Sequence, residues 1–278
     1  NFTATLLVTL LVLSGQFVFG QANFFKMYGG ENYDAGNSIV QLDDSSYVIA
    51  GTSGSFHDGH AQAFLMKVDS LGNYIWSYDF GGYENESFEK VLHKSNMGFY
   101  GLGYSNSLNN GGYDLFLTKT DENGIEEWSK TYGGDEWDKA VDAAFTSDSG
   151  LMIVGETKVD SIGGKEIWFL RTDASGDTLW TETLGFEGDD YVTSIESYQD
   201  SLLIISAQVY IADSLTSKAY LYYMHENGTV ISEDTLGSGP GEYIINDFFV
   251  RNDSLIGIGT HFTSIDSITN VCVFMLDV

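Results

Sequence analysis

The stretch that decides the fold is Trp128-Ser129-Lys130-Thr131-Tyr132-Gly133-Gly134, because it recurs at a fixed spacing along the chain. It appears 52 residues earlier as Trp76-Ser77-Tyr78-Asp79-Phe80-Gly81-Gly82, and again 52 residues later, beginning at Trp180. The same step of 52 residues links Gly51, Gly103, Gly155, Ala207 and Gly259, and it links Asp69, Asp121, Asp173, His225 and Asp277. A repeat of this length predicts a series of similar supersecondary units that pack on one another.

Each repeat contains four strand signals separated by turns. In the first copy the predicted strands are 38–42, 47–52, 63–69 and 73–80. The second and third strands are apolar on both faces, whereas the fourth alternates and is expected to lie on the outside. Four strands in about 50 residues are typical of a propeller blade. The sequence therefore predicts an all-β fold, a five-bladed β-propeller of four-stranded antiparallel blades over residues 23–278.

The repeat register also predicts how the ring closes. The fifth copy runs only as far as its third strand, 271–277, while residues 24–28 align with the fourth strands of the other copies. We expect this N-terminal strand to complete the fifth blade and to cover both free sheet edges. A fragment of a larger ring is the alternative.

The charge balance excludes several partners. The chain of 278 residues carries 12 Lys+Arg and 40 Asp+Glu, a net charge of −28. Such a surface repels phosphate backbones and anionic lipid headgroups, so we expect no nucleic-acid partner. No stretch after residue 22 is apolar for long enough to span a bilayer. The sequence predicts a monomer without a membrane-inserted segment.

The first 22 residues predict secretion. An apolar run, Ala4–Leu13, precedes Gly20-Gln21-Ala22, which has the small residues that signal peptidase accepts, so cleavage is expected after Ala22. The single cysteine, Cys272, forms no internal disulfide, as is common in secreted bacterial proteins. The predicted location is outside a bacterial cell or on its surface.

The repeat unit combines Trp-Ser-x-Thr-Tyr-Gly-Gly with Asp-Ser-Gly-Leu-Met-Ile-Val-Gly, the latter at 148–155. It resembles the secreted β-propeller repeat proteins of Bacteroidota, many of which carry a type IX secretion sorting domain. The resemblance covers residues 23–278 and weakens in the fourth and fifth copies, which lose Gly-Gly. It implies a secreted propeller and supplies no catalytic residues.

One loop position after the fourth strand is acidic in every copy, namely at Asp34, Glu86, Asp138, Asp190 and Glu242. Carboxylates on one face of a ring favour a ligand site or Ca²⁺, with Asp138, Asp190 and Glu242 as the possible calcium ligands. The alternative is a role inside each repeat, in which the acid accepts backbone N–H bonds or pairs with Lys67, Lys119 and Arg171.

Aromatic residues occur in the same loops, namely Tyr33, Trp137, Tyr191 and Tyr243. Exposed rings beside carboxylates are typical of sugar-binding sites, since the rings stack on C–H faces and the acids bind hydroxyls. The alternative is that each ring packs over its own loop. Trp137 is the most suggestive, because it lies outside the strand positions that hold the other tryptophans.

These features predict a non-catalytic binding or scaffold module for a glycan or another extracellular protein. The sequence lacks a G-x-S-x-G elbow, an H-E-x-x-H motif and a phosphate loop. The alternative is an extracellular polysaccharide hydrolase or lyase, with Glu187, Asp189 and Asp190 as acid and base. Histidines His57, His60 and His261, in equivalent loops, are a weaker indication of a metal site.

Overall fold

The computed structural model describes residues 24–55, 60–107, 112–159, 164–185, 188–199, 201–211, 216–237, 241–263 and 268–277. Regular secondary structure within these ranges consists of β-strands. No helix in the described ranges is long and apolar enough to cross a membrane. The predicted signal peptide lies outside the described residues.

The strands form five antiparallel sheets that follow one another in chain order. The first sheet contains β1 (Asp34–Gln41), β2 (Tyr47–Ser53), β3 (Gln62–Val68) and β4 (Tyr74–Phe80). The second contains β5 (Glu86–Lys94), β6 (Gly98–Ser105), β7 (Asp114–Thr120) and β8 (Glu126–Tyr132). The third contains β9 (Asp138–Phe145), β10 (Leu151–Val159), β11 (Gly164–Thr172) and β12 (Thr178–Leu184). The fourth contains β13 (Tyr191–Tyr198), β14 (Leu202–Ile211), β15 (Thr216–His225) and β16 (Val230–Leu236). The fifth contains β17 (Glu242–Arg251), β18 (Ser254–Thr263) and β19 (Ile268–Asp277).

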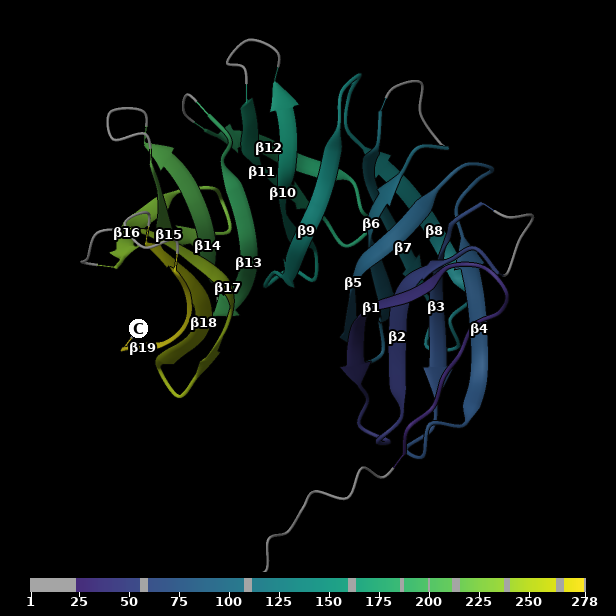
Figure 1. The fold of residues 1–278 in the computed structure, drawn as a ribbon. Helices are drawn as coiled ribbons and strands as arrows, with labels where there is room; N and C mark the ends of the chain where they lie inside the picture. The colour runs from purple at the N-terminus through teal and green to yellow at the C-terminus, as the bar shows by residue number, and fades with distance from the viewer. Residues whose placement is uncertain are drawn as a thin grey trace, which may run out of the picture.

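The predicted series of five antiparallel sheets is confirmed. The predicted order of strands within each sheet is also confirmed, since β7 is buried along its whole length whereas β16 is mostly exposed. The sheets are arranged side by side around an arc (Figure 1), and their facing surfaces hold the cores. Between the first and second sheets, for example, Leu65 and Phe80 pack with Phe88 and Phe116.

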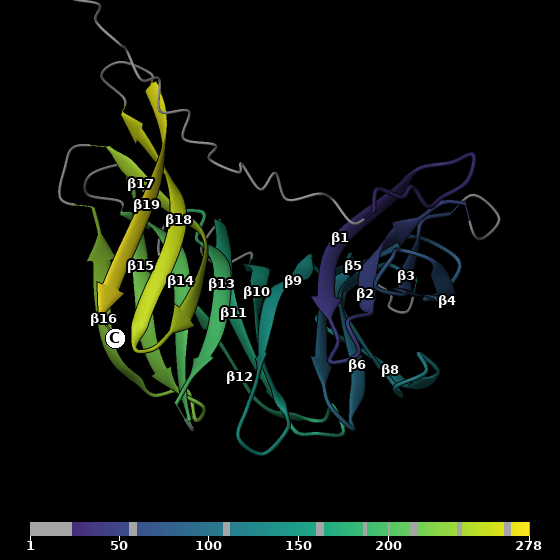
Figure 2. The same cartoon turned by 90° about the horizontal axis from the view of Figure 1, so that it is seen from below.

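The arc is open in the structure, so the predicted closed ring is not seen (Figures 1 and 2). The fifth sheet has three strands, and residues 24–28, which were predicted to be its fourth strand, have no strand conformation. Tyr28 instead donates a hydrogen bond from its hydroxyl to the carbonyl of Gly72 in the first sheet. The ring of Phe24 lies 6.2 Å from that of Tyr47.

Residues 24–28 lie there because they repeat a contact made at the first three junctions between sheets. A Cβ added to the turn glycine Gly124 would lie 2.7 Å from Trp76 of the preceding sheet, and one added to Gly176 would lie 2.6 Å from Trp128. Phe24 takes the same place over Gly72, where an added Cβ would lie 2.5 Å from the ring. Residues 24–28 therefore contact the first sheet as the fourth strand of a preceding sheet would.

A chain of polar side chains joins the inner strands. Each of β1, β5, β9, β13 and β17 contains a bulge that follows the acidic position. Next to these bulges, Lys90 on β5 forms an ion pair of 2.7 Å with Asp142 on β9. The hydroxyl of Ser194 on β13 lies 3.1 Å from the carboxylates of both Asp142 and Asp247, the latter on β17. Polar contacts thus link the second sheet to the fifth.

Candidate functional site

The five acids lie at equivalent places, at or just before the start of the first strand of each sheet. Glu86, Asp138 and Asp190 are almost completely buried, whereas Asp34 and Glu242 are half-buried. The structure places one acid in each sheet. In the described ranges no three His, Cys, Asp or Glu side chains are grouped so that they could hold a metal ion, and this includes the three possible calcium ligands.

Two of these carboxylates, those of Asp34 and Asp138, bind the backbone of their own loops. Asp34 accepts hydrogen bonds from the backbone N–H of Gly30 and the hydroxyl of Ser55, each at 2.8 Å. Asp138 accepts the N–H of Gly134 at 2.8 Å, the equivalent bond in the third sheet. Burial alone would raise the pKa of Asp34, but hydrogen bonds from Ser53 and from the loop outweigh it and lower the pKa.

The basic residues Lys67, Lys119 and Arg171 pair with other carboxylates, not with this acidic position. Lys67 lies 3.6 Å from Asp44, and Lys119 pairs with Glu127. Arg171 donates to Asp148 at 2.6 Å. Partial burial opposes ionisation of Asp148, but the hydrogen bond from Arg171 outweighs it and lowers the pKa of that carboxyl to about 2.

The four loop aromatics differ in exposure. Tyr33 is 71% exposed and Trp137 is 53% exposed, whereas Tyr191 and Tyr243 are half-buried. Tyr243 stacks on His261 with ring centres 4.1 Å apart, so its ring packs over its own sheet. Trp137 is the exposed ring that borders a pocket, and it lies immediately before β9.

Around Trp137 the structure forms a three-ring aromatic cage that sequence reasoning missed. The ammonium group of Lys139 lies 4.7 Å from the ring centre of Tyr104, 5.4 Å from that of Tyr113 and 5.0 Å from that of Trp137. Tyr113 meets both other rings edge to face at 5.1 Å. Tyr104 and Tyr113 come from the second sheet, whereas Trp137 and Lys139 come from the third, so the cage spans a junction between sheets.

Gly112 allows the backbone beside Tyr113 to approach the ring of Trp137. A Cβ added to Gly112 would lie 2.4 Å from Cδ1 of Trp137, closer than any side chain allows. The backbone beside Tyr113 therefore lies directly against the indole, which holds one edge of the ring in place.

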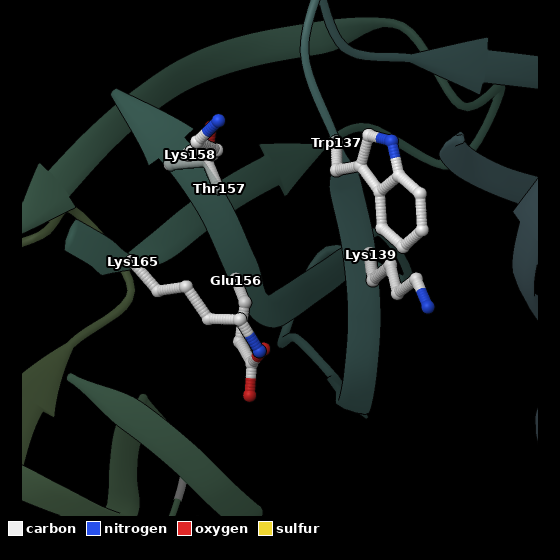
Figure 3. A pocket seen from close by; sticks show the side chains of 6 residues that line it. All are labelled: Trp137, Lys139, Glu156, Thr157, Lys158 and Lys165. Carbon is white, nitrogen blue, oxygen red and sulfur yellow. The ribbon is translucent and has the colours of Figure 1, made fainter. Parts of the chain in front are cut away.

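The pocket itself has a volume of about 170 Å³ and is formed at one end of the third sheet. It is lined by Trp137, Lys139, Glu156, Thr157, Lys158 and Lys165 (Figure 3). In Figure 3 the indole of Trp137 lies beside the stem of Lys139, and the ends of Lys165 and Glu156 meet at an ion pair of 2.9 Å. Lys158 lies 3.6 Å from Glu136 at the edge of the pocket.

Asp189 and Asp190, which were suggested as catalytic acid and base, each accept a hydrogen bond from a backbone N–H. Asp190 is completely buried and accepts the backbone N–H of Tyr210 at 2.7 Å. Asp189 accepts the backbone N–H of Lys165 at 2.9 Å and the hydroxyl of Tyr191 at 3.3 Å. Glu187 and His57 lie outside the described residues.

The inner polar chain contains a carboxyl group with a perturbed pKa. Burial raises the pKa of Glu196 on β13, the charges of Asp142 and Asp247 raise it further, and Lys90 opposes them. The pKa of Glu196 is therefore higher in the folded state than in the unfolded state. Below the unfolded-state pKa the group is protonated in both states, and its full contribution to the stability of the fold is present. It is lost as the pH rises through the folded pKa.

We expect Glu196→Gln to raise the melting temperature by a few degrees at pH 7.5 and to leave it unchanged at pH 4. The substitution removes a buried negative charge that destabilises the fold. This charge is present only at pH values at which Glu196 would be ionised. Thermal unfolding followed by circular dichroism at both pH values measures the difference. Glu182→Gln, at an exposed position of β12, is the matched control. An equal shift at both pH values would contradict the electrostatic cause.

Comparisons with known proteins support the fold alone. No protein-family model matches the chain. The regulatory protein FlaEY of Caulobacter vibrioides is 24% identical over 228 residues, which are 72% of this chain and 23% of that protein. A mutant of the Synechocystis apocarotenoid oxygenase superposes with a TM-score of 0.51 and 11% identity, covering 85% of this chain and 58% of that one. Puromycin hydrolase gives 0.50 and 13% identity, covering 88% and 38%. The chain therefore spans less than two thirds of the length of each of these proteins.

Proposed function

We propose that this chain is a non-catalytic binding module of a secreted bacterial protein, and that it binds an extracellular glycan at the pocket beside Trp137. The observation that carries the proposal is the exposed indole at the edge of a pocket lined by lysine, glutamate and threonine side chains. An aromatic face stacks on the C–H face of a sugar, while charged and hydroxyl groups around it bind the sugar hydroxyls.

The position of Trp137 supports a binding role more than a packing role. The tryptophans of the repeat, such as Trp76 and Trp128, lie over the turn glycine of the next sheet and serve the fold. Trp137 lies outside that series and leaves half of its surface exposed. Its cage fixes the ring, so a ligand that stacks there orders little additional structure.

The strength of binding to a glycan array is expected to fall about thirtyfold or more in Trp137→Ala, as at a central aromatic contact. The control is Tyr33→Ala, which removes a more exposed loop ring from the first sheet, away from the pocket. Release of shorter sugars from the same array would instead favour the polysaccharide-active enzyme. If no glycan bound, or if both variants bound like the unmodified protein, the proposed site would be wrong.

We also propose that the five sheets close into a ring, with residues 24–28 as the fourth strand of the fifth sheet. Apolar side chains at both ends of the arc support this. Val273 on β19 is 72% exposed, whereas its equivalents in the other four sheets are buried, namely Leu65, Leu117, Phe169 and Leu221. At the other end Ile39 is 62% exposed, whereas Val91, Ala143 and Ile195 are buried.

Within the arc these two positions meet at the first three junctions. Leu65 packs in one cluster with Val91, and Leu117 packs in one with Ala143. Closure would bring Val273 against Ile39 in the same way and remove both from water. Burial of two such side chains stabilises by about 1.5–3 kcal/mol each. The free edge of β19 would at the same time gain a hydrogen-bonded neighbour.

A further inference from the structure

The lining of the pocket is unusual for so acidic a chain. Three of its six lining residues are lysines, although the whole chain has only 12 Lys+Arg against 40 Asp+Glu. Glu156 is the one carboxylate among the lining residues. The lining thus carries a formal charge of 3 − 1 = +2, or +1 when Glu136 at the edge is included.

The unmatched charge belongs to Lys139. Lys165 pairs with Glu156 and Lys158 pairs with Glu136, whereas Lys139 has no ion pair with any described residue. Its ammonium group is held by three aromatic rings, which attract a cation but do not neutralise it. A half-buried cation without a counter-charge is destabilising, and an anion placed against it would remove that cost.

We infer that the pocket binds the anionic group of an acidic sugar, a carboxylate or a sulfate, with Lys139 against the anion and Trp137 against the sugar ring. This inference rests on the proposed glycan-binding function and specifies the chemical class of the glycan. Lysine binds such groups through a charge-assisted hydrogen bond, which is stronger than a bond to a neutral hydroxyl. Lys158 and Lys165 line the same pocket and add to its positive charge.

The size and shape of the pocket favour a sugar over an acidic peptide. Its volume of about 170 Å³ is below the roughly 300–1,000 Å³ of pockets for drug-sized ligands, so it suits a single ring. The flat indole matches the C–H face of a pyranose, whereas the flexible side chains of aspartate and glutamate offer no such face.

The test measures affinity for matched pairs of oligosaccharides that differ only in the anionic group. The probes are an oligogalacturonate and its methyl ester, and a sulfated galactan oligomer and its desulfated form. The unmodified protein is expected to bind at least one anionic probe about tenfold or more tightly than its neutral partner. Comparison of the two pairs distinguishes a carboxylate from a sulfate.

Lys139→Met keeps the apolar stem under the rings and is expected to abolish this preference, so that the anionic probe and its neutral partner bind the variant with affinities within about twofold of each other. Lys130→Met is the control, because it removes the same charge from a lysine that pairs with Asp177. Circular dichroism and the melting temperature establish that each variant is folded. If Lys139→Met does not fold, Lys139→Gln replaces it.

The outcomes separate this inference from the function on which it rests. Equal affinity of the unmodified protein for anionic and neutral probes overturns the inference and leaves glycan binding intact. A preference that persists in Lys139→Met also overturns it. Binding of an oligoglutamate peptide with no binding of any sugar overturns both proposals, as does the absence of binding to every probe.

Discussion

Replacing Phe88 with alanine is expected to lower the free energy of unfolding by about 3–5 kcal/mol, the usual cost of removing a buried aromatic ring. Phe88 lies on β5 with no exposed surface, at the junction of the first and second sheets. Its ring is stacked on Phe116 at 5.5 Å and packs against Phe80 at 5.6 Å. Neighbours on two sheets hold the cavity open, so relaxation recovers little of the loss.

Urea unfolding of Phe88→Ala and the unmodified protein measures this change. Tyr83→Ala is the control, because its ring is 92% exposed and its removal is expected to change stability by no more than about 0.5 kcal/mol. The loss predicted for Phe88 is a large fraction of the roughly 5–15 kcal/mol that stabilises a typical domain. Similar small changes in both variants would show that the junction between the sheets is not a packed core.

The architecture is predictable from the sequence because the information is local and repeated. Each strand is bounded by turn residues, and the same positions recur in every copy, so Phe64 and Phe116 are expected in the same buried environment. The structure places both in the core. Agreement between periodicity, turn chemistry and repeat register is what makes such a prediction reliable.

The fifth copy shows where this reasoning fails. Cys272 shares its position with Phe64, so the repeat predicts a buried side chain, yet Cys272 is only half-buried. The repeat pattern predicts which side chains face a neighbouring sheet, but it does not show that the neighbour is in place. Exposure at β19 depends on the arrangement of the whole arc, to which residues far apart in sequence contribute.

Only part of the candidate site was predictable from the sequence, because packing between two sheets brings some of its residues together. Trp137 stands out because it breaks the series of strand tryptophans, and Lys139 lies two residues later on the same face of β9. Tyr104 and Tyr113 belong to the preceding sheet, and only the packing of two sheets brings them to Lys139. The acidic position was visible, but its hydrogen bonds to the backbone of its own loop are a matter of side-chain geometry.

Closure of the ring predicts a specific pairing of residues. In the first four sheets the third and fourth strands share one register, in which Phe64 lies opposite Asp79 and Phe116 lies opposite Thr131. Cys272 is the equivalent of Phe64 in the fifth copy, and Met27 lies 52 residues before Asp79. In a closed ring the same register therefore places Met27 opposite Cys272. Residues that face each other in antiparallel strands have Cα atoms about 4.5–5.5 Å apart, a separation that a disulfide spans.

The most direct test of closure is therefore the substitution Met27→Cys, which adds one thiol to a chain whose only cysteine is Cys272. Under mild oxidation we expect an intramolecular disulfide between the two, identified by mass spectrometry of the cross-linked peptides. Because it closes a loop of almost the whole chain, it is expected to stabilise the fold by up to about 5 kcal/mol. Lys26→Cys is the control, since its side chain points to the opposite face of the strand. An open arc predicts the contrary result, in which both variants keep two free thiols or form only intermolecular disulfides.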